Sequence, residues 1–318
     1  MRVAVFAAGA VGGYFGGRLA QSGEEIAFIA RGDHLRAIRE RGLRVDSIAG
    51  DFIVHPADAT DDPRQVGPVD CVILAVKTWQ LPQAVEQIGP LVGRDTFVVP
   101  LLNGVEAPEV LAKAFGEDHV LGGLCRILAR VAGPGHVQHT GVDPSIHFGE
   151  LDGSRTERTE RLLAAFDRAG GVRAAVPDDI NVGLWEKLLS VASIGGVGAV
   201  TRAPVGVNRS VEQTRAVLEA AMAEIGAVAR VRGVPLPQNA VEEALAFMDR
   251  LPDHGRTSLH QDIADGRRSE LDAWNGAVVR LGREAGVETP VHAFLYASLL
   301  PQELRARGDV EFAGPPAR

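Results

Sequence analysis

The chain has 318 residues, more than one hydrophobic core usually supports, so we expect two domains. Its composition, 46% hydrophobic and 23% charged, is typical of a folded soluble protein, and the net charge of −8 argues against a surface for nucleic acid or anionic membranes. Small molecules are therefore the expected partners. Met1 leads directly into an apolar run, and no apolar run approaches the roughly 20 residues that cross a bilayer, which predicts a cytoplasmic protein without a membrane segment.

The two cysteines form neither a metal-binding pattern nor a disulfide framework. Cys71 lies in an apolar run and is interpreted as a small buried hydrophobe, whereas Cys125 follows Gly122-Gly123 and is interpreted as a loop thiol. The nine histidines show no ligand spacing such as H-E-x-x-H. We expect no metal.

Residues 3–20 predict a strand, a tight turn and a helix, the first half of a dinucleotide-binding unit. The fingerprint of such units is G-x-G-x-x-G, and its three glycine positions are occupied by Ala7, Gly9 and Gly12. Gly9 lets the backbone approach a pyrophosphate, and Gly12 lets the helix pack close to the strand. The residues expected at the cofactor here are Ala8, Gly9, Ala10, Val11 and Gly12.

Ala7 departs from the fingerprint at the position that forms the tight turn. An alanine fits there only if its φ angle is negative, because the left-handed region favours glycine. Taken alone, the stretch therefore also allows an interpretation in which small residues merely permit close packing of helix and strand.

A second strand is predicted over residues 25–30, and Arg31 follows it. An NAD-preferring unit carries Asp or Glu at this place, where the carboxylate binds the ribose 2′-hydroxyl. Arg31 instead offers a cation with planar donors, which suits a 2′-phosphate and favours NADP over NAD. The alternative is an arginine of a solvated loop.

Lys77 and Asn103 each follow a continuous apolar run, 69–76 and 96–102 respectively. Such runs are typical of parallel strands buried on both faces, and ligands bind beyond the carboxyl ends of such strands. Both side chains are therefore candidates for a site. The alternatives are a strand-end lysine that reaches solvent and a simple Asn-Gly turn.

Several further elements complete the predicted first domain. A short helical segment carries Leu35, Ile38 and Leu43, and an apolar triplet and a loop rich in Pro and Asp follow it. Residues 122–149 predict further, antiparallel strands that complete the sheet, and 158–169 predict its last helix. Breaks at Gly170-Gly171 and Val176-Pro177 predict the domain boundary, giving domains 1–176 and 177–318.

The second domain is predicted to be all-helical and to open with a helix capped by Asp178 or Asp179. Its apolar stripe comprises Ile180, Leu184, Val191 and Ile194. Lys187 falls on this stripe, where a lysine must be paired or have a lowered pKa, as general acid chemistry requires. The alternative is a lysine whose stem packs while its ammonium reaches solvent.

Capping residues, glycines and prolines predict where the later helices begin and end. Ser210 begins a capping box for a helix to Arg232, and a further helix lies between Pro237 and Pro252. Two short segments carry the candidate residues Ser258, near a helix start, and Glu270, in a first helical turn. Their alternatives are a cap and a carboxylate that complements the helix dipole. The last helix begins at Pro290, and 305–318 are predicted to be a loose tail.

These residues together resemble the ketopantoate reductase (2-dehydropantoate 2-reductase) family over essentially the whole chain. The matching segments, in order, are Gly9-Ala10-Val11-Gly12-Gly13, Arg31-Gly32, Lys77, Asn103-Gly104, Leu184-Trp185-Glu186-Lys187-Leu188, Thr257-Ser258 with Asp262, and Glu270-Leu271-Asp272 with Asn275-Gly276. The resemblance implies an α/β fold: an N-terminal Rossmann-type doubly wound sheet, a C-terminal all-helical domain, an active site in the cleft between them, and NADP(H) as cofactor.

The resemblance also implies roles for the candidate residues. Lys187 would be the general acid and Glu270 its acidic partner and substrate ligand. Asn103 and Ser258 would position the substrate or the nicotinamide, and Lys77 would lie beside cofactor and substrate. The implied reaction is reduction of 2-dehydropantoate to pantoate, a 2-oxo acid to a 2-hydroxy acid, in pantothenate biosynthesis.

The chain departs from the family at two positions after Lys187. Where the family usually carries asparagines that face the substrate, this chain has Val191 and Gly195. Loss of two polar ligands predicts weaker recognition of ketopantoate and leaves open a paralogue that reduces a less polar 2-oxo acid. A non-catalytic NADP(H)-binding regulator is a further alternative, and the helical domain offers surfaces for a homodimer without a pattern that identifies one.

Overall fold

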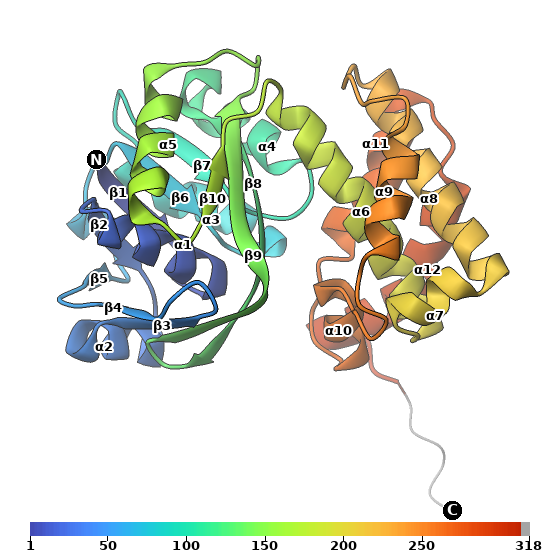
Figure 1. Cartoon of the computed structure of the whole chain (residues 1–318), viewed down its shortest axis with the longest axis horizontal. Coiled ribbons are helices and arrows are strands. Elements are labelled where there is room, and N and C mark those ends of the chain that lie inside the picture. Colours follow the sequence, from blue (N-terminus) through green and yellow to red (C-terminus); the bar gives the residue numbers. More distant parts are fainter. Residues whose placement is uncertain (313–318) are drawn as a thin grey trace, which may run out of the picture. The chain divides into compact units, whose positions relative to one another are not determined.

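The computed structural model describes residues 1–312, which form two compact units (Figure 1). Unit 1 comprises Met1–Leu102 and Glu106–Gly183, and unit 2 comprises Asn103–Val105 and the chain from Leu184 onward. The chain passes from one unit to the other inside a helix, α6 (Ile180–Thr201). The first unit is α/β and the second is helical, which confirms the predicted fold class.

Unit 1 is built on a five-stranded parallel sheet in the order β5-β2-β1-β6-β7. Its strands are β1 (Arg2–Phe6), β2 (Glu25–Ile29), β5 (Asp58–Thr60), β6 (Cys71–Leu74) and β7 (Phe97–Pro100). Every residue of β6 and β7 is buried, because helices cover both faces of the sheet. Burial raises the pKa of the Cys71 thiol, in keeping with its interpretation as a small buried hydrophobe.

A second sheet corrects the prediction that residues 122–149 complete the first. The antiparallel hairpin β8 (Leu121–Gly133) and β9 (His136–Glu150) forms instead with β3 (Leu43–Ser47), β4 (Phe52–Val54) and β10 (Arg173–Ala175). Leu43 therefore belongs to a strand rather than to the preceding helix, α2 (Gly32–Arg41). Cys125 is likewise a buried residue of β8 and not a loop thiol.

Helix α1 (Ala10–Gln21) packs against both sheets, and four glycines permit this. A Cβ atom on Gly16 would lie 2.5 Å from Val5 Cγ2 of the parallel sheet. A Cβ atom on Gly17 would lie 2.6 Å from Phe52 Cε2 of the second sheet. One turn earlier, Gly12 faces the parallel sheet and Gly13 faces the second sheet in the same way. Helix α5 (Glu157–Ala169) contacts α1 and contributes Leu162 and Phe166 to the same core.

The opposite face of the parallel sheet is covered by helices α3 (Leu81–Ile88) and α4 (Ala107–Phe115). Apolar side chains alternate along β1 between the two cores: Val3 and Val5 face α1, whereas Ala4 and Phe6 face α3 and α4. A single-turn segment, Thr78–Gln80, connects β6 to α3.

The regular secondary structure in the described part of unit 2 is all helical. After α6 it contains α7 (Val205–Ser210), α8 (Glu212–Val231), α9 (Ala240–Asp249), α10 (Ser258–Ala264), a π-helical turn (Asp272–Gly276), α11 (Ala277–Ala285) and α12 (Pro290–Arg307). Helix α8 contacts α7, α9, α11 and α12 (Figure 1). The helix start at Asp179 is confirmed, since its carboxylate accepts a hydrogen bond from Asn181 N at 2.8 Å.

Two predictions for unit 2 are corrected. Ser210 is the last residue of α7, and its hydroxyl donates to Val207 O, so α8 begins after Val211 without a side-chain cap. The predicted tail starts too early, because α12 continues to Arg307. Residues 313–318 of that tail lie outside the described residues.

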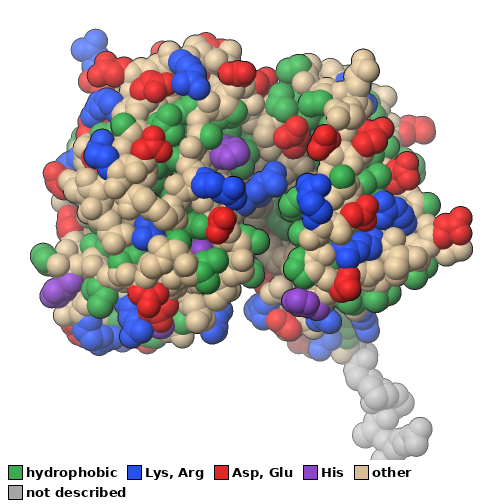
Figure 2. Space-filling view, viewed as in Figure 1, with side chains coloured by type: hydrophobic (Ala, Val, Ile, Leu, Met, Phe, Trp, Pro, Cys, Tyr) green, Lys and Arg blue, Asp and Glu red, His purple; other side chains and the backbone are tan. Residues whose placement is uncertain are grey.

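Acidic and basic side chains are interspersed over the visible face of each unit (Figure 2). Several form local ion pairs, such as Lys113 with Glu109 on α4. Exposed pairs of this kind contribute little to stability because water screens them. Within residues 1–312, none of the helices combines the length and the apolar character needed to cross a bilayer.

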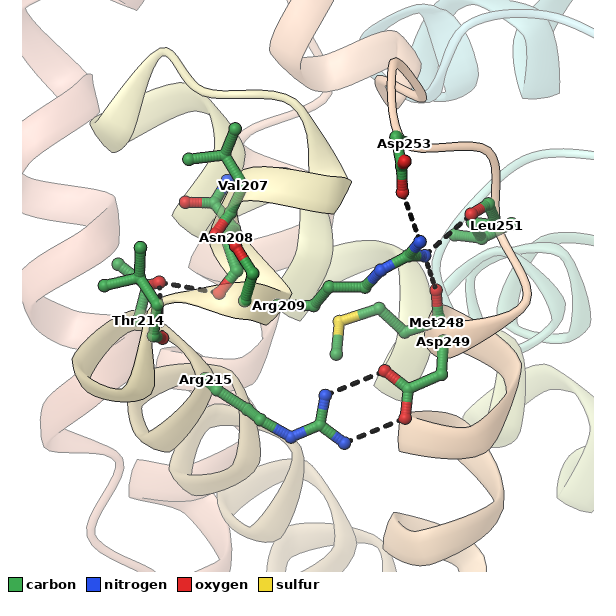
Figure 3. A network of polar contacts seen from close by, with 11 residues as sticks. Val207, Asn208, Arg209, Thr214, Arg215, Met248, Asp249, Leu251 and Asp253 are labelled. Atoms are coloured by element: carbon green, nitrogen blue, oxygen red, sulfur yellow. Dashed lines mark hydrogen bonds and ion pairs between the residues drawn. The ribbon is translucent and has the colours of Figure 1, made fainter.

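Two arginines join α7, α8 and α9 in different ways (Figure 3). Arg209 donates to two backbone oxygens at the end of α9, Met248 O at 3.0 Å and Leu251 O at 2.7 Å, and pairs with Asp253. Arg215 makes a bidentate pair with Asp249 at 2.7 and 2.8 Å. The side chain of Arg209 is 20% exposed and that of Arg215 38%, so Arg209 is the more shielded contact.

Replacing these two arginines should therefore have unequal effects. Arg209→Ala removes the donor to carbonyl oxygens at the end of α9 and should lower the free energy of unfolding by on the order of 2 kcal/mol. Arg215→Ala breaks a more exposed pair and should cost about 0.5 kcal/mol. Urea denaturation followed by tryptophan fluorescence measures both. A loss for Arg215→Ala equal to that for Arg209→Ala would contradict this assignment.

Candidate active site

The turn between β1 and α1 corrects the expectation for Ala7. Its φ angle is +72°, in the left-handed region, so alanine occupies this turn despite its Cβ atom. The turn is tight because the Ala7 carbonyl oxygen lies against Gly12, where any Cβ atom would overlap it. Gly9 is the N-cap of α1 with a φ of −74°, and a Cβ atom there would meet no heavy atom within 4 Å. The backbone is thus open to a ligand at Gly9 and closed at Gly12.

A cavity of about 200 Å³ in unit 1 begins at this turn. Its lining residues are Phe6, Ala7, Ala8, Gly9, Ile29, Ala30, Arg31, His34, Val76, Gln80, Gln83, Ala84 and Gln87. Arg31 is the exposed N-cap residue of α2, and its guanidinium donates to Gln87 Oε1 at 2.7 Å. None of these lining residues is acidic, so the cavity offers an anionic group both a cation and the helix N-terminus.

Lys77 lies beyond the carboxyl end of β6, as predicted, and its side chain is exposed. It is the N-cap residue of the Thr78–Gln80 turn, where its backbone N–H donates to Gln80 Oε1 at 3.1 Å. The Nζ atom lies 5.7 Å from the centre of the Trp79 ring. Within the described residues, no three His, Cys, Asp or Glu side chains cluster as a metal site requires.

Asn103 and Glu270, predicted from separate motifs, are brought together in unit 2. Asn103 Nδ2 donates to Glu270 Oε2 at 2.9 Å, and Glu270 is only 4% exposed. Gly104 has a φ of +91°, and a Cβ atom on it would lie 3.0 Å from Ala273 O. The left-handed Gly104 therefore allows the Asn-Gly segment to pack closely against the turn that follows Glu270. A simple Asn-Gly turn does not require such a close contact.

The segment before Glu270 is anchored by a residue that sequence reasoning missed. Glu303, fully buried on α12, accepts hydrogen bonds from Ser269 N at 2.8 Å and Ser269 Oγ at 2.6 Å. Its other oxygen accepts from Arg307 Nε at 2.8 Å. Glu303 and Arg307 are four residues apart, a spacing that usually marks a solvent-exposed pair, so no local pattern indicated that the carboxylate is buried.

The turn after Glu270 has π-helical hydrogen bonding, with Gly276 N bonded to Leu271 O at 3.0 Å. Such turns are rare and occur frequently at functional sites. Tyr296 donates to Asp272 Oδ1 at 3.1 Å beside it. Burial, and then the Asp272 charge, raise the pKa of Tyr296, so this hydroxyl stays protonated as a donor at neutral pH.

Lys187 and Ser258 lie on two helices of unit 2. Lys187 is half-buried on α6, between the buried Trp185 and Leu188. Ser258 is the exposed first residue of α10. The cap of α10 is Thr257, whose Oγ1 accepts from His260 N at 3.2 Å, so the Ser258 hydroxyl is not used as the cap.

The two departures on α6 differ in their surroundings. Val191 is half-buried. Gly195 is buried, and a Cβ atom on it would lie 3.0 Å from Thr257 Oγ1 and from Trp274 Cζ3. An asparagine at 195 would therefore have to displace these neighbours, and the position presents no polar side chain.

A glycine turn that leads from a strand of a parallel sheet into a helix, with a cavity beside it, is typical of a dinucleotide-dependent enzyme. Residues 3–153 match the family described as ketopantoate reductase PanE/ApbA, and residues 179–303 match its C-terminal part. The chain belongs to the ketopantoate reductase family. This confirms the family predicted from the sequence, whose members are NAD(P)H-dependent oxidoreductases that reduce 2-oxo acids.

Relatives and solved structures extend over nearly the whole chain. The chain is 32% identical to an uncharacterized oxidoreductase, YkpB, of Bacillus subtilis, over 94% of this chain and 98% of the relative. It is 32% identical to a 2-dehydropantoate 2-reductase of Mesorhizobium japonicum, over 91% of this chain and 94% of that relative. The crystal structure of a ketopantoate reductase from Ralstonia eutropha superimposes with a TM-score of 0.87 at 33% identity, covering 96% and 100%. A D-mandelate dehydrogenase solved with NADH has a TM-score of 0.83 at 25% identity, covering 95% and 99%.

The glycine turn yields a paired prediction. Gly12→Ala forces a Cβ atom against the Ala7 carbonyl and should cost about 1–3 kcal/mol of stability, as overpacking does, and weaken dinucleotide binding. Gly9→Ala meets no protein atom, so stability should change by less than about 0.5 kcal/mol while binding still weakens. Thermal unfolding and titration with NADPH separate the two effects. Unchanged NADPH binding in Gly9→Ala would contradict a phosphate site at this turn.

Proposed function

We propose that the protein catalyses the NADPH-dependent reduction of a small 2-oxo acid to the 2-hydroxy acid, and that 2-dehydropantoate, reduced to pantoate in pantothenate biosynthesis, is its first candidate substrate. The observation that carries this proposal is the buried Glu270 held by Asn103 in a chain that matches the family in both parts. A buried carboxylate with an amide partner, next to a π-helical turn, has the surroundings of a functional group.

The proposed chemistry divides between cofactor and protein. NADPH, when bound, supplies the hydride that adds to the C2 carbonyl carbon. Lys187 gives a proton from Nζ to the oxygen on which negative charge develops, so that hydride and proton together make the hydroxyl. Glu270 accepts a hydrogen bond from the substrate and favours the ammonium form of Lys187, and Asn103 and Ser258 position the substrate.

The use of lysine in this chain supports the role of Lys187. Of the 33 Lys and Arg residues, only Lys77, Lys113 and Lys187 are lysines, so the chain uses arginine almost wherever it needs a cation. Arginine is effectively never deprotonated and cannot serve as a general acid, whereas lysine can. Two of the three lysines are candidate site residues, and Lys113 lies in an exposed ion pair.

The test is turnover of NADPH with a panel of 2-oxo acids, including 2-dehydropantoate and less polar acids of similar size. Lys187→Ala should lower kcat by about 10²–10⁴-fold, the usual contribution of a positioned general acid, and leave NADPH binding unchanged. Lys113→Ala is the matched control and should keep full activity, because its ion pair is exposed. Equal kcat values for the Lys187 and Lys113 variants would refute the assignment.

Arg31 is the proposed reader of the 2′-phosphate. It lines the cavity in unit 1, where no acidic residue stands to bind a ribose 2′-hydroxyl. Arg31→Ala should weaken NADPH binding by roughly tenfold or more, since a charge-assisted hydrogen bond is lost, and NADH binding by less than about threefold. Titration of both cofactors measures this. Equal losses would show that Arg31 does not read the phosphate.

A second candidate is a paralogue that reduces a less polar 2-oxo acid. Val191 is apolar, and Gly195 is closed off by Thr257 and Trp274, so neither supplies the amide that the family usually has. The structurally similar D-mandelate dehydrogenase has the same fold and is named for an aromatic 2-hydroxy acid. The panel decides: strong preference for 2-dehydropantoate removes this candidate, and tight NADPH binding without turnover of any acid favours a regulator instead.

A further inference from the structure

His34 connects three segments of unit 1 through both ring nitrogens. Nε2 lies 2.8 Å from Ala8 O in the β1–α1 turn, and Nδ1 accepts a hydrogen bond from Gly135 N at 3.0 Å, in the turn between β8 and β9. His34 itself is half-buried in the first turn of α2 and lines the cavity. The proposed mechanism gives this side chain no role.

The two contacts assign the protonation of the ring. An amide N–H can only donate, so Nδ1 must be the unprotonated nitrogen. Nε2 therefore carries the hydrogen and donates it to the Ala8 carbonyl. The ring is neutral, and both of its nitrogens are committed to backbone groups.

The Gly135 end of this bridge is held firmly. Gly135 O accepts from Arg44 N at 2.9 Å, and a Cβ atom on Gly135 would lie 2.9 Å from Ala37 Cβ of α2. The hairpin turn therefore packs directly on the helix that carries His34. The imidazole therefore links the Ala8 carbonyl to this closely packed turn.

The Ala8 end is where the backbone is strained. Ala7 has a φ of +72°, a conformation that is unfavourable for alanine because its Cβ atom comes too close to the following carbonyl oxygen. Such a conformation persists only where its surroundings fix it. The residue after Ala7 is fixed at both polar atoms: Ala8 N donates to Ile29 O at 2.9 Å, and Ala8 O accepts from His34.

We propose that His34 is a positioning residue for the dinucleotide: it holds the Ala7–Gly9 turn, in which Ala7 is left-handed, in the conformation that leaves the Gly9 backbone open to the pyrophosphate. This inference rests on the proposed function, because it concerns the same cofactor site. His34 touches the turn and not the hydride-transfer chemistry. Its loss should therefore raise the KM and Kd for NADPH and leave kcat at saturating NADPH within about twofold of the wild type.

A double-mutant cycle between His34 and Ala7 tests the proposal. His34→Ala removes two hydrogen bonds and should raise the Kd for NADPH about tenfold. Ala7→Gly removes the strain, because glycine adopts a positive φ freely, so in that background His34→Ala should raise the Kd less than about threefold. His34→Gln keeps a donor and an acceptor and should restore most of the affinity, which also covers a failure of His34→Ala to fold.

His119→Ala is the matched control, since His119 is also half-buried and bonded to a backbone oxygen, Thr96 O at 2.7 Å, without lining the cavity. Its Kd for NADPH should equal that of the wild type. An unchanged Kd in both His34 variants, or the same fold-increase in the wild-type and the Ala7→Gly backgrounds, would overturn the proposal. Wild-type protein that binds neither NADPH nor NADH would instead refute the proposed function, so the two failures are distinguishable.

Discussion

The close approach of α1 to two sheets is the constraint on which unit 1 depends. A helix between two sheets needs small residues on opposite sides, and the glycine pairs Gly12-Gly13 and Gly16-Gly17 supply them one turn apart. The same approach presses Gly12 against the Ala7 carbonyl. The shape of the Ala7–Gly9 turn is thus a consequence of core packing, and the turn tolerates an alanine at position 7 because hydrogen bonds to Ala8 N and Ala8 O fix the next residue.

Unit 2 repeats this principle around α6. Gly195 lies against Thr257 and Trp274, and a Cβ atom on Gly196 would come within 2.6 Å of Asn275 Nδ2. These glycines let α10 and the π-helical turn pack directly on the helix that carries Lys187. Position 195 is therefore a packing position in this chain, because a larger side chain there would have to displace Thr257 and Trp274.

Local patterns predicted most of the fold. Continuous apolar runs placed β6 and β7, and with them Lys77 and Asn103, because a strand buried on both faces has a distinctive composition. The predictions that were wrong concern features that contacts between distant parts of the chain decide. The pairing of β9 with β3, and of β8 with β9, is decided by contacts far apart in sequence. Helix α8 begins after Val211 without a side-chain cap because α7 already uses Ser210.

The candidate site also contains one residue that a local pattern indicates and one that only the fold reveals. Lys187 is detectable because a charge on an apolar stripe is a local anomaly, whereas Glu303 is not, because its pairing with Arg307 is the ordinary pattern of an exposed helix. Only the fold reveals that this carboxylate is buried and bonded to Ser269. A buried carboxylate is stable only when it is hydrogen-bonded, and the two buried carboxylates meet that condition differently. Glu303 accepts hydrogen bonds from Ser269 and so fixes the segment before Glu270, whereas Glu270 accepts a hydrogen bond from the side chain of Asn103.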